Sequence, residues 1–138
     1  MTFAQNSVSV SMWGDYSMYE YRVILVRVYD GDTVFTDKDL GYHVWLKATQ
    51  DPEATEDHGD RLARINAPEL YTIVDGHRVL SDAGVASRDA LIGFLTGKAL
   101  TIQSLRLEKY GRFLVELYAD GVNVNDLMLA GGWAVPYV

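Results

Sequence analysis

Alternating apolar and polar residues predict a chain built mainly from short β-strands. Residues 21–29 alternate in this way, and they end at Asp30-Gly31, a dipeptide that favours a tight hairpin turn. A second strand is therefore expected over residues 33–36. The strand pattern resumes over residues 42–46, which follow a glycine. A third strand is predicted over residues 61–66.

The spacing of apolar residues changes from two to about four in the middle of the chain. Five residues fall on one face of a predicted helix: Ser87, Ala90, Leu91, Phe94 and Leu95. We expect this helix to begin near Ser81 or Asp82 and to end near Gly97. Residues 71–80 precede it and contain a second Asp-Gly pair, which predicts a small hairpin or a loop.

Two more strands and a short helix complete the pattern. The strands are expected from Leu100 and over residues 113–118, and Asn125 is expected to cap the last helix. Trp45 and Trp133 are expected in the core. Five strands with one intervening helix favour a mainly β fold with α elements, a five-stranded OB-type Greek-key barrel with two to three helices. We assign it to residues 21–138 and expect residues 1–20 to form a loosely ordered extension.

Composition adds several constraints. The 138 residues fit one domain, and the absence of cysteine excludes disulfides and thiolate chemistry. The first 20 residues contain no Lys or Arg and no continuous apolar segment. We therefore expect no secretory signal, a cytoplasmic or phage-encoded intracellular setting, no membrane contact and a monomer.

The net charge is −7, which argues against a general nucleic-acid coat protein. Its distribution is uneven. Five acidic residues and no Lys or Arg lie between residues 48 and 60, a stretch that reads as an acidic surface loop. Residues 98–112 carry four basic residues against one acidic residue, so a small electropositive surface is compatible with the sequence.

The first candidate site is Asp30-Gly31-Asp32-Thr33. Glycine allows a tight turn that holds two carboxylates near the strand ends, and hard cations such as Ca²⁺ prefer oxygen ligands of this kind. Taken alone, the same string favours an ordinary hairpin turn with solvated aspartates, because Asp-Gly turns are common.

The second candidate site runs from Arg61 to Glu69. A strand that ends in Asn66-Ala67-Pro68-Glu69 presents an amide oxygen, a backbone carbonyl and a carboxylate within four residues. Glu69 is a candidate base for a water molecule, and Arg61 is a candidate for bidentate phosphate binding. Surface charges at a strand end are the alternative.

The third candidate site is Lys109-Tyr110-Gly111-Arg112, between the last two predicted strands. Basic and aromatic side chains at a hairpin tip suit phosphate recognition and base stacking, although ordinary hairpins also carry them.

In this order and with these neighbours, the three strings resemble the staphylococcal nuclease (thermonuclease) family. That family has a strand running into Asp-Gly-Asp-Thr-Val, an Arg-Leu strand ending in Asp-(small residue)-Pro-Glu, and a Tyr-Gly-Arg after a helix. The chain matches these with residues 30–34, residues 61–69 and residues 110–112. The later Ala119-Asp120-Gly121 and Val124-Asn125 also match, so the resemblance covers about residues 21–135.

The resemblance implies a calcium-dependent nuclease that cuts DNA and RNA and leaves 3′-phosphates. Asp32, Asn66 and the Ala67 carbonyl would bind Ca²⁺, while Asp30 and Thr33 would support these ligands. Glu69 would position or deprotonate the attacking water. Arg61 and Arg112 would bind the phosphate and stabilise the transition state. Lys109 and Tyr110 would contact the substrate.

One departure from the family pattern leaves alternatives open. Asn66 stands where well-known members have Asp, which removes one unit of ligand charge and is expected to weaken Ca²⁺ binding, so another divalent cation could serve. A catalytically weak or inactive OB-fold module that binds nucleic acid or protein is therefore an alternative. A nuclease restrained by its acidic segment is another.

Overall fold

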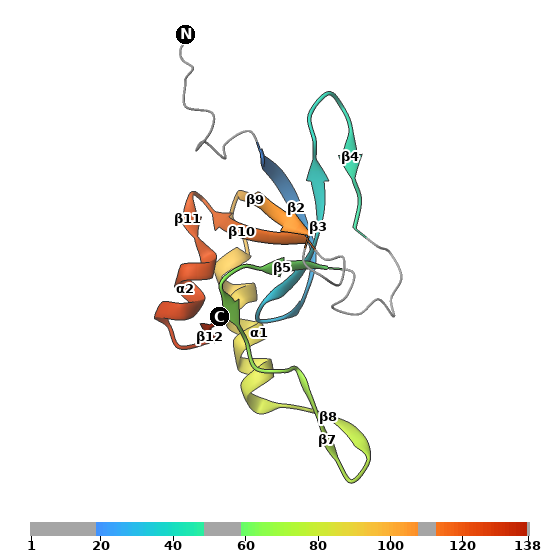
Figure 1. Cartoon of the computed structure of the whole chain (residues 1–138), viewed down its shortest axis with the longest axis vertical. Helices are drawn as coiled ribbons and strands as arrows, with labels where there is room; N and C mark the ends of the chain where they lie inside the picture. Colours follow the sequence, from blue (N-terminus) through green and yellow to red (C-terminus); the bar gives the residue numbers. More distant parts are fainter. Residues whose placement is uncertain (1–18, 49–58, 108–112, 138) are drawn as a thin grey trace.

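A closed five-stranded β-barrel forms the centre of the protein (Figure 1). The computed structural model describes residues 19–48, 59–107 and 113–137. The barrel strands are β2 (Glu20–Asp30), β3 (Thr33–Asp39), β5 (Asp60–Leu62), β9 (Leu100–Leu107) and β10 (Phe113–Ala119). They pair in the order β10-β5-β3-β2-β9, and β9 pairs with β10 to close the barrel. Only β5 and β10 run parallel among these pairs. This is the predicted OB-type topology.

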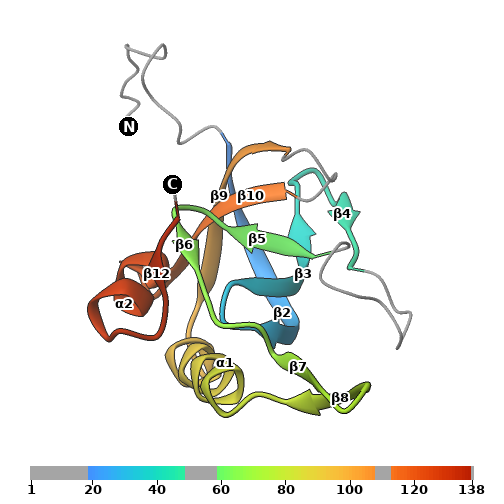
Figure 2. The ribbon, with the colours of Figure 1, turned by 60° about the horizontal axis from the view of Figure 1, so that its bottom comes forward.

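Two helices pack against the barrel. Helix α1 (Asp82–Leu95) lies below it in Figure 2 and contributes Leu91 and Leu95 to the core. Ser81 caps α1, as predicted, because its side chain accepts a hydrogen bond from the Gly84 N–H. Helix α2 (Val124–Ala130) follows β10 and buries Val124 and Met128. In the part of the chain that the structure describes, no helix is long and apolar enough to cross a membrane.

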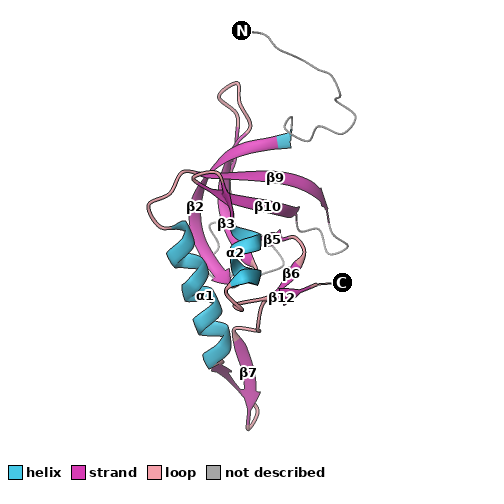
Figure 3. Cartoon of the chain, turned by 90° about the vertical axis from the view of Figure 1, so that its left-hand side faces the viewer, coloured by secondary structure: helices cyan, strands magenta, loops and turns pink. Residues whose placement is uncertain are grey.

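Short strands extend this framework. Strand β4 (Trp45–Leu46) pairs with β3, and β11 (Val122–Asn123) pairs with β10. Strands β6 (Ile65–Asn66) and β12 (Val135–Pro136) pair antiparallel, which brings the C-terminal segment beside Asn66. Strands β7 (Tyr71–Val74) and β8 (His77–Leu80) form a hairpin that projects beyond α1 (Figure 3). The Asp75-Gly76 turn of this hairpin confirms the prediction for residues 71–80.

Several local predictions were wrong. The strand expected over residues 42–46 is reduced to two residues because Tyr42 and His43 have φ values of 57° and 62°. Trp45 and Trp133 are not in the core, since they are 40% and 38% exposed. The cap of α2 is Asn123, and Asn125 is buried inside the helix. Of the predicted loosely ordered extension, residues 1–18 lie outside the described residues.

The acidic segment ends in a strand of the barrel. Residues 49–58 lie outside the described residues, but Asp60 is part of β5 and is buried. Its Oδ2 lies 2.9 Å from Lys38 Nζ and accepts a hydrogen bond of 2.6 Å from Thr36. Asp60 is therefore a paired structural residue and not part of a solvated acidic surface.

Candidate active site

The turn between β2 and β3 holds Asp32 at the barrel rim. The Asp32 N–H donates to Asp30 Oδ1 (3.1 Å), and the Thr33 hydroxyl donates to Asp32 Oδ1 (3.1 Å). All three side chains are buried. Gly31 packs so closely that an added Cβ would collide with Ser87 and lie 2.8 Å from Ala67 Cβ. The turn is thus fixed by its own hydrogen bonds and by packing against α1.

Arg61 meets the Asp32 carboxylate directly. Arg61 Nη1 lies 2.9 Å from Asp32 Oδ2, and their side chains are only 11% and 6% exposed. The two residues meet because β3 pairs with β5, with Thr33 opposite Arg61. The same Oδ2 accepts a hydrogen bond of 2.8 Å from the Ala67 N–H. A buried carboxylate needs such partners because the interior solvates charge poorly.

Arg61 also links Asp32 to Asn66 and to the C-terminal segment. Its Nη2 lies 3.5 Å from Asn66 Oδ1, a weak contact, and its Nη1 donates to the Leu62 carbonyl (3.3 Å). The Tyr137 ring centroid lies 5.5 Å from the guanidinium carbon. The Arg61 guanidinium therefore contacts both Asp32 and Asn66, and Asp32 in turn binds the Ala67 N–H.

Glu69 lies at the corner that follows Asn66 and Ala67. Its side chain is exposed and makes no ion pair or hydrogen bond with the residues the structure describes. Its backbone is held by the helix: the Ser81 N–H donates to the Leu70 carbonyl (2.8 Å), and Gly84 packs against the Glu69–Leu70 peptide. The carboxylate is thus unengaged while its attachment point is fixed.

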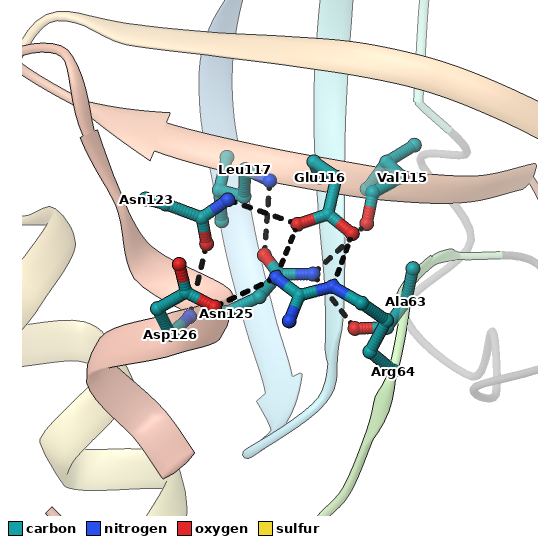
Figure 4. Close-up of polar contacts among 8 residues, drawn as sticks. All are labelled: Ala63, Arg64, Val115, Glu116, Leu117, Asn123, Asn125 and Asp126. Atoms are coloured by element: carbon teal, nitrogen blue, oxygen red, sulfur yellow. Dashed lines mark hydrogen bonds and ion pairs between the residues drawn. The ribbon is translucent and has the colours of Figure 1, made fainter. Parts of the chain in front are cut away.

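A polar network holds the turn between Arg61 and Asn66. The predicted strand over residues 61–66 is broken there, because Arg64 has a φ of 71°. Arg64 donates to both Glu116 oxygens (2.8 and 2.7 Å) and to Asp126 (2.8 Å), as Figure 4 shows. The buried Asn125 amide donates to the Ala63 and Val115 carbonyls (2.9 and 3.1 Å). These bonds fix the separation of β5 and β6.

The charges in this network reinforce one another. Hydrogen bonds to Glu116, and then to Asp126, raise the pKa of Arg64 further above its usual range, against the opposing effect of burial. Arg64 therefore stays charged and keeps Glu116, whose side chain is 10% exposed, ion-paired.

We expect Arg64→Ala to lower the free energy of unfolding by about 2–3 kcal/mol, because Glu116 loses its bidentate partner. Arg64→Gly removes the same ion pairs, but glycine tolerates the positive φ at this position. We therefore expect Arg64→Gly to be more stable than Arg64→Ala by about 1 kcal/mol. Urea denaturation of both variants checks this expectation. Equal stability of the alanine variant and the unmodified chain would contradict it.

The third predicted string lies outside the described residues, so the positions of Lys109, Tyr110 and Arg112 are not described. The neighbouring described residue is informative. Phe113 begins β10 and pairs with Asp60, the residue that precedes Arg61. The strand that follows Arg112 therefore starts beside the strand that carries Arg61.

The oxygen atoms at this rim fit a hard cation. Among the described residues, Asp32 Oδ1 accepts the Thr33 hydroxyl hydrogen bond and has further acceptor capacity. Asn66 and the Ala67 carbonyl offer neutral oxygens. Across residues 19–48, 59–107 and 113–137, no three Asp, Glu, His or Cys side chains converge on a metal position. A cation here would therefore be held by one carboxylate and neutral oxygens.

The sequence patterns missed Tyr137, Asn125 and Gly84. Tyr137 reaches Arg61 only because β12 pairs with β6, and Asn125 only resembled a helix cap. No periodicity distinguishes Gly84 from the other glycine of the same helix. Each of these roles depends on contacts between segments that are distant in sequence.

Fold and site together define an OB-barrel protein that carries a buried Asp–Arg pair and an exposed glutamate at its rim. The sequence model of the family described as "Staphylococcal nuclease homologue" matches residues 61–138, more than half of the chain. The protein belongs to this staphylococcal nuclease homologue family.

Individual relatives agree with the family assignment. A protein named "Uncharacterized endonuclease" from Escherichia coli O157:H7 is 31% identical over 115 residues, which cover 82% of this chain and 59% of that protein. "Probable staphylococcal-like nuclease CAN1" from Oryza sativa subsp. japonica is 29% identical over 99 residues, 72% of this chain and 27% of the relative. The chain thus spans less than two thirds of the length of these relatives.

Proposed function

We propose that this protein is a metal-dependent endonuclease that hydrolyses phosphodiester bonds of DNA, RNA or both. Family membership supports a nuclease. The observation that carries the proposal to this chain is the convergence of Asp32 and Asn66 on the Arg61 guanidinium. Ca²⁺ is the cation that the resemblance favours, and Asp32, Asn66 and the Ala67 carbonyl would hold it.

Arg61 is suited to bind the substrate phosphate. Its contacts with Asp32, Leu62 and Asn66 use both Nη1 hydrogens and one Nη2 hydrogen. The Nε–H and the second Nη2 hydrogen have no partner among the described residues, and a guanidinium can offer two such donors to two phosphate oxygens. Asp32 keeps the guanidinium in this orientation. In the proposed reaction, Arg61 therefore stabilises charge that builds up on the phosphate oxygens.

Glu69 is the proposed general base. It accepts a proton from a water molecule whose oxygen forms a new bond to phosphorus, and the bond from phosphorus to the 5′ oxygen breaks. The 5′ oxygen leaves with the bonding electrons, Arg112 stabilises its negative charge, and it takes a proton from solvent, so the products are a 3′-phosphate and a 5′-hydroxyl. A bound divalent cation would supply Lewis-acid polarisation of the phosphate.

A cleavage assay tests this proposal. Purified protein is incubated with single- and double-stranded DNA and RNA in the presence of Ca²⁺, Mg²⁺ or a chelator. We expect cleavage that requires a divalent cation and yields ends with a 3′-phosphate. Products that carry a 5′-phosphate, or cleavage in chelator, would contradict the mechanism.

A binding module without catalysis is the second candidate function. The neutral Asn66 favours it, because a neutral ligand weakens the attraction for a cation. The net charge of −7 also favours it, because it repels a nucleic-acid substrate and suits a protein partner. The exposed Glu69 carboxylate argues against this function, because an OB-type barrel can bind nucleic acid without such a carboxylate. Binding of oligonucleotides without cleavage in any metal would support this function.

The cation affinity is expected to depend on Asn66. We expect Asn66→Asp to lower the Ca²⁺ concentration at half-maximal activity by about tenfold, because the variant adds one unit of ligand charge. A metal titration of cleavage measures this value. An unchanged titration for Asn66→Asp would remove Asn66 from the ligand set.

A further inference from the structure

Helix α1 touches the backbone of the corner that carries Glu69. A Cβ added at Gly84 would collide with the Glu69 carbonyl oxygen and would lie 2.7 Å from Leu70 Cα. Both obstacles are backbone atoms, which cannot rotate away as a flexible side chain can. At the same end of the helix, the Ser81 N–H donates a hydrogen bond of 2.8 Å to the Leu70 carbonyl. The first turn of α1 therefore fixes the position of the Glu69 peptide.

This contact explains a residue that local propensity disfavours. Glycine is a poor helix former, and α1 contains two, Gly84 and Gly93. A Cβ at Gly93 would meet nothing within 4 Å, so that glycine has no such packing role. Gly84, by contrast, is buried between the helix and the Glu69 corner.

We propose that Gly84 is a positioning residue for Glu69, an inference that rests on the proposed nuclease function. The Glu69 side chain forms no hydrogen bond or ion pair with the residues the structure describes, so its backbone position sets where the carboxylate can reach. A general base must lie within hydrogen-bond reach of its proton. Asp32, in the turn between β2 and β3, and Arg61, in β5, are joined by an ion pair that involves neither Gly84 nor the Glu69–Leu70 peptide.

The test compares Gly84→Ala with Gly93→Ala, the same chemical change in the same helix. We expect Gly84→Ala to lower kcat by about 10- to 100-fold, because a displacement of about 1 Å can cost that much. The KM for an oligonucleotide and the metal titration should change much less than kcat, because the Asp32–Arg61 ion pair involves neither Gly84 nor the Glu69–Leu70 peptide. Gly93→Ala should raise the Tm through helix propensity and leave kcat unchanged.

Two further variants separate positioning from stability. Adding Gly93→Ala to Gly84→Ala should restore the Tm of the unmodified protein, but kcat should stay as low as in Gly84→Ala alone. Adding Gly84→Ala to Glu69→Gln should cause little further loss of the residual cleavage rate, because the base that it positions is already absent.

Three outcomes would overturn the inference. They are an unchanged kcat in Gly84→Ala, recovery of kcat together with the Tm in the double glycine variant, and an undiminished effect of Gly84→Ala in the Glu69→Gln background. Absence of cleavage by the unmodified protein in every metal is a different result. It would refute the nuclease proposal itself, and the role of Gly84 with it.

Discussion

Glu69→Gln is expected to lower kcat by about 10²- to 10⁴-fold, the range that a well-placed general base contributes. Glutamine has nearly the same shape as glutamate but cannot accept the proton of the attacking water. The Glu69 side chain is exposed and has no ion pair among the residues the structure describes. The variant should therefore fold with an unchanged Tm, so the loss would be a loss of chemistry.

Glu20→Gln is the matched control for this variant. Glu20 is also exposed, but it lies at the start of β2, away from the Asp30–Thr33 turn at the other end of that strand. We expect it to cleave at the rate of the unmodified protein. Initial rates at saturating oligonucleotide and metal compare the two variants. Equal rates for Glu69→Gln and Glu20→Gln would exclude Glu69 as the base.

The order of the elements along the chain and the barrel class could be predicted from the sequence because the barrel is built from strong local signals. Asp30-Gly31 marks the first hairpin, and Ser81 marks the start of α1, so these elements follow from turn and cap chemistry. The break at Arg64 could not be predicted, since a positive φ at arginine is locally unfavourable. It persists because Glu116 and Asp126, more than 50 residues away in sequence, bind its side chain.

The candidate site was predictable as a set of residue types and not as an arrangement. The resemblance gave Asp32 and Asn66 a role as cation ligands and Arg61 a role in phosphate binding, and in the structure Arg61 contacts both Asp32 and Asn66. The direct Asp32–Arg61 ion pair follows from the pairing of β3 with β5, which no single string reveals. Asp60 was misassigned for the same reason. Its position in a run of acidic residues predicted a surface loop, but in the structure it is a buried ion-pair partner of Lys38.

Arg61 is the residue whose loss should affect stability and activity together. Arg61→Ala leaves the buried Asp32 carboxylate without its cationic partner, and we expect the free energy of unfolding to fall by about 3–5 kcal/mol. Arg61→Lys keeps a positive charge near Asp32 and should retain most of the stability. Lysine lacks the planar pair of donors for phosphate, so we expect cleavage by Arg61→Lys to fall at least about 100-fold.

Arg22→Ala is the matched control for Arg61→Ala, because Arg22 also forms an ion pair with an aspartate, Asp39, at 3.1 Å. The Arg22 side chain is 81% exposed, and such surface pairs contribute about 0–1 kcal/mol. Urea denaturation gives the stability of each variant, and initial rates give its activity. Similar stability losses in Arg61→Ala and Arg22→Ala would show that the buried pair is not structurally important. Full activity in Arg61→Lys would show that the phosphate does not need the guanidinium fork.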